Sequence, residues 1–101
     1  MTDFFDNSVE PLGEVGTARQ LVAGSASSNT ALSASVRRIS IRAVGADIRF
    51  SIGTGTQTAH GNDSHFIANG ERLDFAIPKA ANIAIIRDGT VNGTLELTEL
   101  I

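Results

Sequence analysis

The chain has 101 residues and a formal net charge of −3 at pH 7, with 42% hydrophobic and 19% charged residues. These proportions predict one folded domain and exclude a disordered chain. The chain has no cysteine, which excludes disulfides and cysteine-based metal sites. No apolar run approaches the ~20 residues that cross a bilayer, and residues 1–6 lack the pattern of a signal peptide. We therefore expect a protein made in the cytoplasm, with no membrane role.

The charge is unevenly distributed along the chain. The first 18 residues contain four acidic side chains and no Lys or Arg: Asp3, Asp6, Glu10 and Glu14. The remainder holds all eight basic residues and the other seven of the eleven acidic ones. Because phosphate binding requires a basic surface, we expect no nucleic-acid partner. Seven of the eight basic residues are Arg, which is enriched at protein interfaces where Lys is depleted.

Residues 1–16 are predicted to form an extended N-terminal arm. Pro11 and two glycines interrupt any regular element there, and the segment does not alternate. Phe4, Phe5 and Leu12 are apolar residues on this segment, which has no core of its own. They fold back on the domain, stay disordered, or dock in a groove on a neighbouring subunit, where ordering costs entropy but covers a large surface.

From residue 17 onward the chain reads as short strands separated by turns. A weak strand is expected at residues 17–23, and the strongest at 36–44, where Ile39 and Ile41 alternate with polar residues. Residues 47–52 alternate again after Gly45, so the two strong strands are predicted to form an antiparallel hairpin.

Four arginines then lie on this predicted hairpin: Arg37, Arg38, Arg42 and Arg49. They form either a solvated outer face with cross-strand acidic partners or a contact with an acidic partner surface, such as the arm of a neighbouring copy.

The polar loop at residues 53–64 begins Gly-Thr-Gly but lacks the Gly-Lys-Ser/Thr ending and the following helix of a phosphate-binding loop. His60, Asp63 and His65 could together bind a divalent cation, but no third His or Cys completes the set. A solvated loop is the preferred interpretation. We therefore predict no metal and no cofactor.

Four further strands are expected at residues 65–68, 72–77, 82–87 and 94–100, giving about seven in all. Short strands at regular spacing without a helical pattern predict an all-β fold, an antiparallel β-sandwich or jelly-roll-like barrel. We assign residues 1–16 to the arm and 17–101 to the β-sandwich domain.

No catalytic site is predicted. The chain has two His, no Cys and no nucleophile-elbow sequence, and its carboxylates are scattered on turns and outward positions. Sugar binding usually needs exposed aromatic rings, yet the chain has no Trp or Tyr, and Phe50, Phe66 and Phe75 fall at expected core positions. We therefore expect a binding or structural protein and not an enzyme.

The strand-and-turn order from about residue 18 to the end resembles a group of small tailed-phage virion proteins. The resemblance is carried by residues 30–32 leading into 36–39, and then by 45–53, 66–71, 74–78, 83–87 and 93–100. It implies a β-sandwich on the capsid exterior as a decoration or cement protein, with the major capsid protein as partner. A head-fibre or neck position is also open, and the acidic arm is outside the resemblance.

Our hypothesis is a homo-oligomer, a dimer or trimer, that is made in the host cytoplasm and bridges neighbouring capsomers in the virion. The candidate interface residues are Phe4, Phe5, Leu12, Arg37, Arg38, Arg42 and Arg49. The alternatives are a receptor- or glycan-binding fibre or tail module and a head-to-tail neck component.

Overall fold

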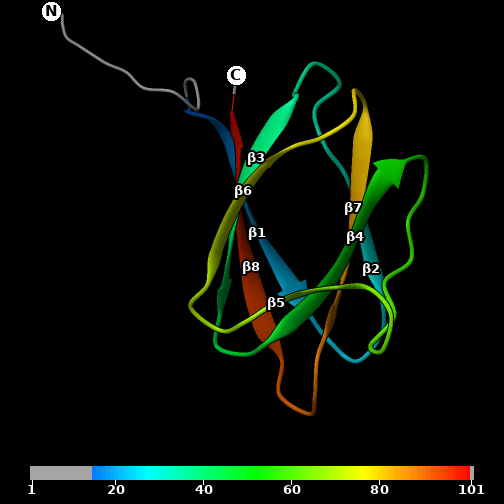
Figure 1. Cartoon of the computed structure of the whole chain (residues 1–101), viewed down its shortest axis with the longest axis vertical. Helices are drawn as coiled ribbons and strands as arrows, with labels where there is room; N and C mark the ends of the chain where they lie inside the picture. The colour runs from blue at the N-terminus through cyan, green and yellow to red at the C-terminus, as the bar shows by residue number, and fades with distance from the viewer. Residues whose placement is uncertain (1–14, 101) are drawn as a thin grey trace, which may run out of the picture.

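The computed structural model describes residues 15–100, which form eight strands in two layers (Figure 1). The strands are β1 (Val15–Ala23), β2 (Ser28–Ala31), β3 (Arg38–Val44), β4 (Ile48–Thr54), β5 (His65–Ile67), β6 (Arg72–Ala76), β7 (Ala81–Arg87) and β8 (Gly93–Leu100). This described part contains no helix, and so no helix that could span a membrane. The predicted all-β class is confirmed.

The strand order is that of a jelly roll. Sheet A has the order β1-β8-β3-β6 and sheet B the order β2-β7-β4-β5, and all neighbours are antiparallel. First pairs with last, second with seventh, third with sixth and fourth with fifth. Such nested pairing results when one long double ribbon is rolled into two facing sheets, as in eight-stranded jelly rolls. Of the two predicted alternatives, the antiparallel β-sandwich is therefore confirmed, and its strand order is that of a jelly roll.

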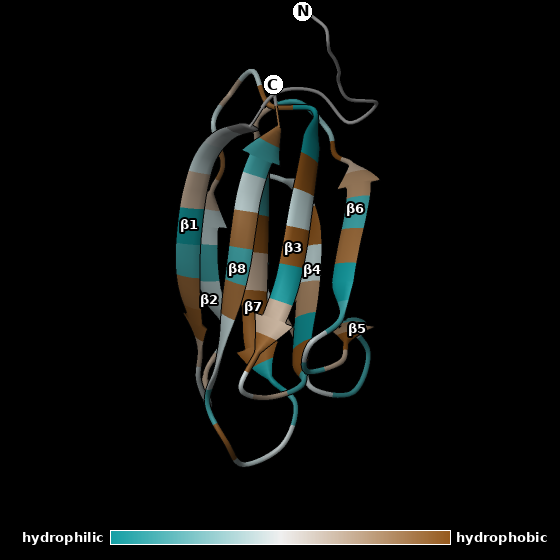
Figure 2. Cartoon of the chain, turned by 90° about the vertical axis from the view of Figure 1, so that its left-hand side faces the viewer, coloured by the Kyte–Doolittle hydropathy of each residue, from teal (hydrophilic) through white to brown (hydrophobic). Residues whose placement is uncertain are grey.

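The core lies between the two sheets and is built from residues of every strand except β2. Hydrophobic and hydrophilic residues alternate along the strands of sheet A (Figure 2). On β3, Ile39 and Ile41 are fully buried, whereas Arg42, in the outward phase, is exposed. Apolar residues in the inward phase of β7 and β8 are buried in the same way. Removal of this apolar surface from water is the main stabilising contribution to such a fold.

The predicted hairpin of β3 and β4 is wrong. The two strands lie in different sheets, because β3 pairs with β6 and β8 while β4 pairs with β5 and β7. The turn at Gly45, whose φ of 90° suits glycine, carries the chain from sheet A to sheet B. Two strands that pair in one sheet and two strands in facing sheets show the same alternation of apolar residues. The sequence therefore could not distinguish a hairpin from a connection between the two sheets.

One further strand and one boundary differ from the prediction. Strand β2 was not predicted, because its sequence Ser-Asn-Thr-Ala has no apolar alternation; it forms an edge strand on β7. Strand β1 begins at Val15, so the last two residues assigned to the arm belong to the sandwich. Residues 1–14 lie outside the described part of the chain.

The polar loop between β4 and β5 is attached to the edge of sheet B. The backbone N–H of Gln57 donates to Asn29 Oδ1 at 2.9 Å, and that of Ala59 donates to Ser27 Oγ at 2.8 Å. The sequence predicted a solvated loop. Ala59 is buried, however, so part of the loop is packed against the domain. Figure 1 shows it passing beside β2 before it returns to β5.

Candidate binding site

The two long sides of the sandwich, β1 facing β2 and β6 facing β5, are closed in different ways. On the β1 side, Glu99 occupies the inward phase of β8 and is 1% exposed. Nε and Nη2 of Arg19 donate to Glu99 Oε2 at 3.1 and 3.0 Å. Ser33 donates from its hydroxyl to Oε1 at 2.6 Å and from its backbone N–H to Oε2 at 3.1 Å. These three residues, the Glu99 cluster, tie β1, β8 and the β2–β3 connection together.

The Glu99 cluster stabilises the ionised carboxylate. Burial alone would raise the pKa of Glu99, but the hydrogen bonds from Ser33 and the Arg19 guanidinium outweigh it and hold the pKa below its ordinary value of 4.5. A carboxylate whose pKa is lowered by folding stabilises the fold above the pKa of the unfolded chain. That contribution is lost as the pH falls through the folded-state pKa.

We therefore expect a Glu99→Gln variant to unfold at a lower urea concentration than the wild type at pH 7. The difference between the two should shrink as the pH falls below 4.5, the ordinary pKa, and through the lower pKa of Glu99 in the folded protein. Urea midpoints across the pH range measure this difference, and a constant difference at all pH values would contradict the role assigned to Glu99.

On the opposite side a groove opens between β6 of sheet A and the β4–β5 edge of sheet B. Strand β5 has three residues and pairs only with Ile48–Phe50 of the seven-residue β4. Within residues 15–100, the remaining length of β4 has no strand beside it on that side. The result is a cavity of about 470 Å³, lined by Phe50, Ile52, His65, Phe66, Leu73, Phe75, Ala76, Ile77 and Pro78.

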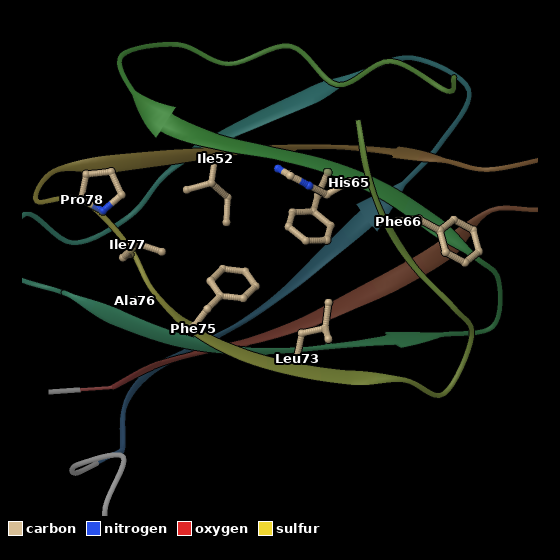
Figure 3. A pocket seen from close by; sticks show the side chains of 9 residues that line it. Ile52, His65, Phe66, Leu73, Phe75, Ala76, Ile77 and Pro78 are labelled. Atoms are coloured by element: carbon tan, nitrogen blue, oxygen red, sulfur yellow. The ribbon is translucent and has the colours of Figure 1, made fainter. Parts of the chain in front are cut away.

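The groove has apolar walls (Figure 3). Ile52 of β4 and Phe75 of β6 point toward each other across it, and both are only partly buried. The Phe75 ring stacks on the Phe50 ring, with ring centroids 5.9 Å apart. The Phe50 ring also lies beside the His65 ring, with ring centroids 5.5 Å apart. Among the described residues that line the groove, His65 alone is ionisable. A site of this size and character suits apolar side chains of a ligand or peptide.

Phe66 is not a core residue, contrary to the prediction. It pairs with Arg49 in the outward phase of sheet B and is 43% exposed. The Arg49 guanidinium lies 4.9 Å from the centre of its ring, and Arg49 Nε also donates to Asp88 Oδ1 at 3.1 Å. A three-residue strand is too short for alternation to indicate which residue faces inward, so the sequence could not assign Phe66.

The four predicted interface arginines do not lie on one surface. Arg38 and Arg42 are on the outer face of sheet A, and Arg49 is on the outer face of sheet B. Arg37 precedes β3 at one end of the sandwich. Phe4, Phe5 and Leu12 lie outside the described residues.

Sequence reasoning missed Arg72, which extends the basic surface of sheet A. It pairs with Arg42 across β3 and β6 and donates from Nη1 to Ser40 Oγ at 2.8 Å. We call Arg38, Arg42 and Arg72 the arginine face. In the sequence, the arginine face is indicated only by the outward phase of Arg72. The pairing of β3 with β6, which are distant in the chain, brings Arg72 beside Arg42.

His60, Asp63 and His65 do not form a metal site. Within residues 15–100 no three His, Asp or Glu side chains are grouped so as to hold a metal ion. The His60 backbone exchanges hydrogen bonds with Ser64, whereas the ring of His65 lines the groove.

No protein-family model matches the chain, and no curated protein or solved structure matches it either.

Proposed function

We propose that this chain is a structural virion protein of a tailed phage that decorates or cements the capsid by bridging neighbouring capsomers. The observation that carries the proposal is the eight-stranded jelly roll, an architecture that recurs in viral capsid domains. The strand-and-turn resemblance to small phage virion proteins points the same way. Jelly rolls also serve other roles, lectins among them, so the fold supports this one by analogy.

The outer face of sheet A has the composition of a protein contact surface. Val22 and Val44 are 64% and 41% exposed and flank Thr94 in one row across β1, β8 and β3. The arginine face adjoins this row. Apolar side chains beside arginines are typical of interfaces, and we propose this surface as the contact with an acidic patch of the major capsid protein.

Arg42 and Arg72 support an acidic partner in particular. They face each other directly across two strands, an arrangement of like charges that weakens a sheet by itself. Glu96 lies opposite Arg42 on its other side, and the exposed Asp74 lies two residues from Arg72 on the same face, so both carboxylates offset part of this repulsion. A partner carboxylate would relieve the remainder.

Cementing works through many copies of one modest contact. A protein that binds the assembled shell but not its separate subunits stabilises the shell by linkage, as a ligand stabilises a folded protein. Self-association into a dimer or trimer would multiply the contacts made by each bound unit. No catalytic group, cofactor or metal is required for this role.

Purified particles test the role directly. Gel densitometry should show many copies of the chain per particle, and particles lacking it should release their DNA at a lower temperature. Unchanged heat release would contradict cementing, and a few copies per particle would favour a neck component.

An Arg42→Ala variant should separate binding from folding. Because Arg42 is exposed on the outer face, its loss is expected to change the free energy of unfolding by less than about 0.5 kcal/mol. Removing one charge from the contact should nevertheless weaken binding to particles that lack the protein. Co-sedimentation with such particles measures this, with Arg87→Ala as the control that removes an arginine from β7 of sheet B. Equal binding by both variants would contradict the assignment of the outer face of sheet A.

A receptor- or glycan-binding fibre or tail module is the second candidate, and the exposed Phe66 ring favours it. An exposed aromatic ring is a common platform for sugars. Binding of the whole protein to defined glycans, lost in Phe66→Ala, would support this candidate over cementing.

A further inference from the structure

We propose that the groove between β6 and the β4–β5 edge is the docking site for the Phe4–Phe5 segment of the same chain. This inference concerns a docking surface on the sandwich and is independent of the proposed role in a virion.

The groove offers both apolar walls and an incomplete sheet edge. Ile52 and Phe75 remain partly exposed across it, and residues 51–54 of β4 have no partner strand on that side within the described part of the chain. Exposed strand edges bind extended segments by backbone pairing, while adjacent pockets take alternate side chains. An extended segment with an aromatic side chain matches both features.

The position of Val15 brings the N-terminal segment within reach. Val15 pairs with Leu100, Leu100 with Arg38 and Arg38 with Ala76, so the backbone start of β1 and the groove residue Ala76 lie in one row across sheet A. Three strand spacings separate them, about 14 Å. The ten residue steps from Phe5 to Val15 extend to about 33 Å, more than this distance.

The charges along this path are complementary. Asp3 and Asp6 flank the two phenylalanines, and residues 1–14 contain no basic residue. Arg37 and Lys79 are exposed at the end of the sandwich that the segment would cross. The carbonyl of Arg37 accepts a hydrogen bond from the Ile77 N–H at 2.8 Å, which places Arg37 beside the groove lining.

The same chain is a better source of the segment than a second copy. A short tether that can span its site gives an effective concentration in the millimolar range. A second copy that is not already associated with the first would compete for the groove only at a comparable protein concentration.

A single tryptophan tests the proposal, because the full chain contains no Trp or Tyr. In Phe5→Trp, we expect blue-shifted emission and several-fold slower quenching by acrylamide than for free N-acetyltryptophanamide. Adding Ile52→Asp to the groove wall should restore the emission and quenching of an exposed tryptophan, whereas Ile52→Val should not. Circular dichroism checks that each variant is folded.

A second measurement leaves the groove intact. In heteronuclear NMR spectra of the full chain, Phe4→Ser/Phe5→Ser should shift the amide signals of Ile52, His65 and Ile77. The matched double substitution Asn7→Ala/Ser8→Ala should not shift them. A fully exposed indole in the Phe5→Trp variant, together with unchanged groove signals in the double serine variant, would overturn the proposal. So would indole protection that disappears on dilution, since that identifies a second copy as the occupant.

Discussion

Replacing Ile41 with alanine is expected to lower the free energy of unfolding by about 2–5 kcal/mol, the usual cost of truncating a buried Ile. Ile41 is fully buried at the centre of β3, between β6 and β8. The cavity left behind would lie between two sheets, beneath a strand that is held by a neighbour on each side, so the site cannot collapse fully. For a domain of this size the melting temperature should fall by at least about 8 °C.

The matched control is Val44→Ala on the same strand. Val44 is 41% exposed on the outer face, and its truncation should cost less than about 0.5 kcal/mol. Thermal and urea unfolding of the two variants measure the contrast. Similar losses in both would mean that the alternation along β3 does not define the core.

Replacing Glu99 with alanine is expected to cost about 3 kcal/mol, at the lower end of the range for breaking a buried ion pair. The substitution leaves the Arg19 guanidinium and two donors of Ser33 without their acceptor. Arg19 retains partial access to water, with 28% of its side chain exposed, which limits the loss.

Glu96→Ala on the same strand is the control for the Glu99 variant. Glu96 faces outward and accepts a hydrogen bond from Gln20 at 3.1 Å in an exposed setting, so its removal should have little effect on stability. Urea unfolding at pH 7 compares the stability of the Glu99→Ala and Glu96→Ala variants. A Glu99→Ala protein as stable as the Glu96→Ala protein would show that the Glu99 cluster does not hold β1 to the sandwich.

The alternation of apolar residues was sufficient to predict most of the strands. Residues 36–44 and 94–100 carry clear inward and outward phases, and both segments contain strands with that phase. Pairing was not predictable in the same way, because an alternating strand has the same pattern whichever partner it has. The predicted β3–β4 hairpin failed for this reason.

The binding surfaces were harder to predict than the fold. The groove exists because β5 ends after three residues, and nothing in the sequence of residues 65–67 indicates where pairing stops. The arginine face depends on β3 lying beside β6, which are far apart in the chain. Glu99 did carry a signal, since it shares the phase of the buried Leu95 and Leu97.

Cryo-electron microscopy of purified virus particles that contain the chain tests the proposed capsid role most directly. We expect many copies of a two-layered, eight-stranded body on the outside of the capsid, each with the outer face of sheet A against neighbouring capsomers. A particle whose exterior carries no such density, or that holds the chain only at a fibre tip or neck, would contradict the role in capsid decoration.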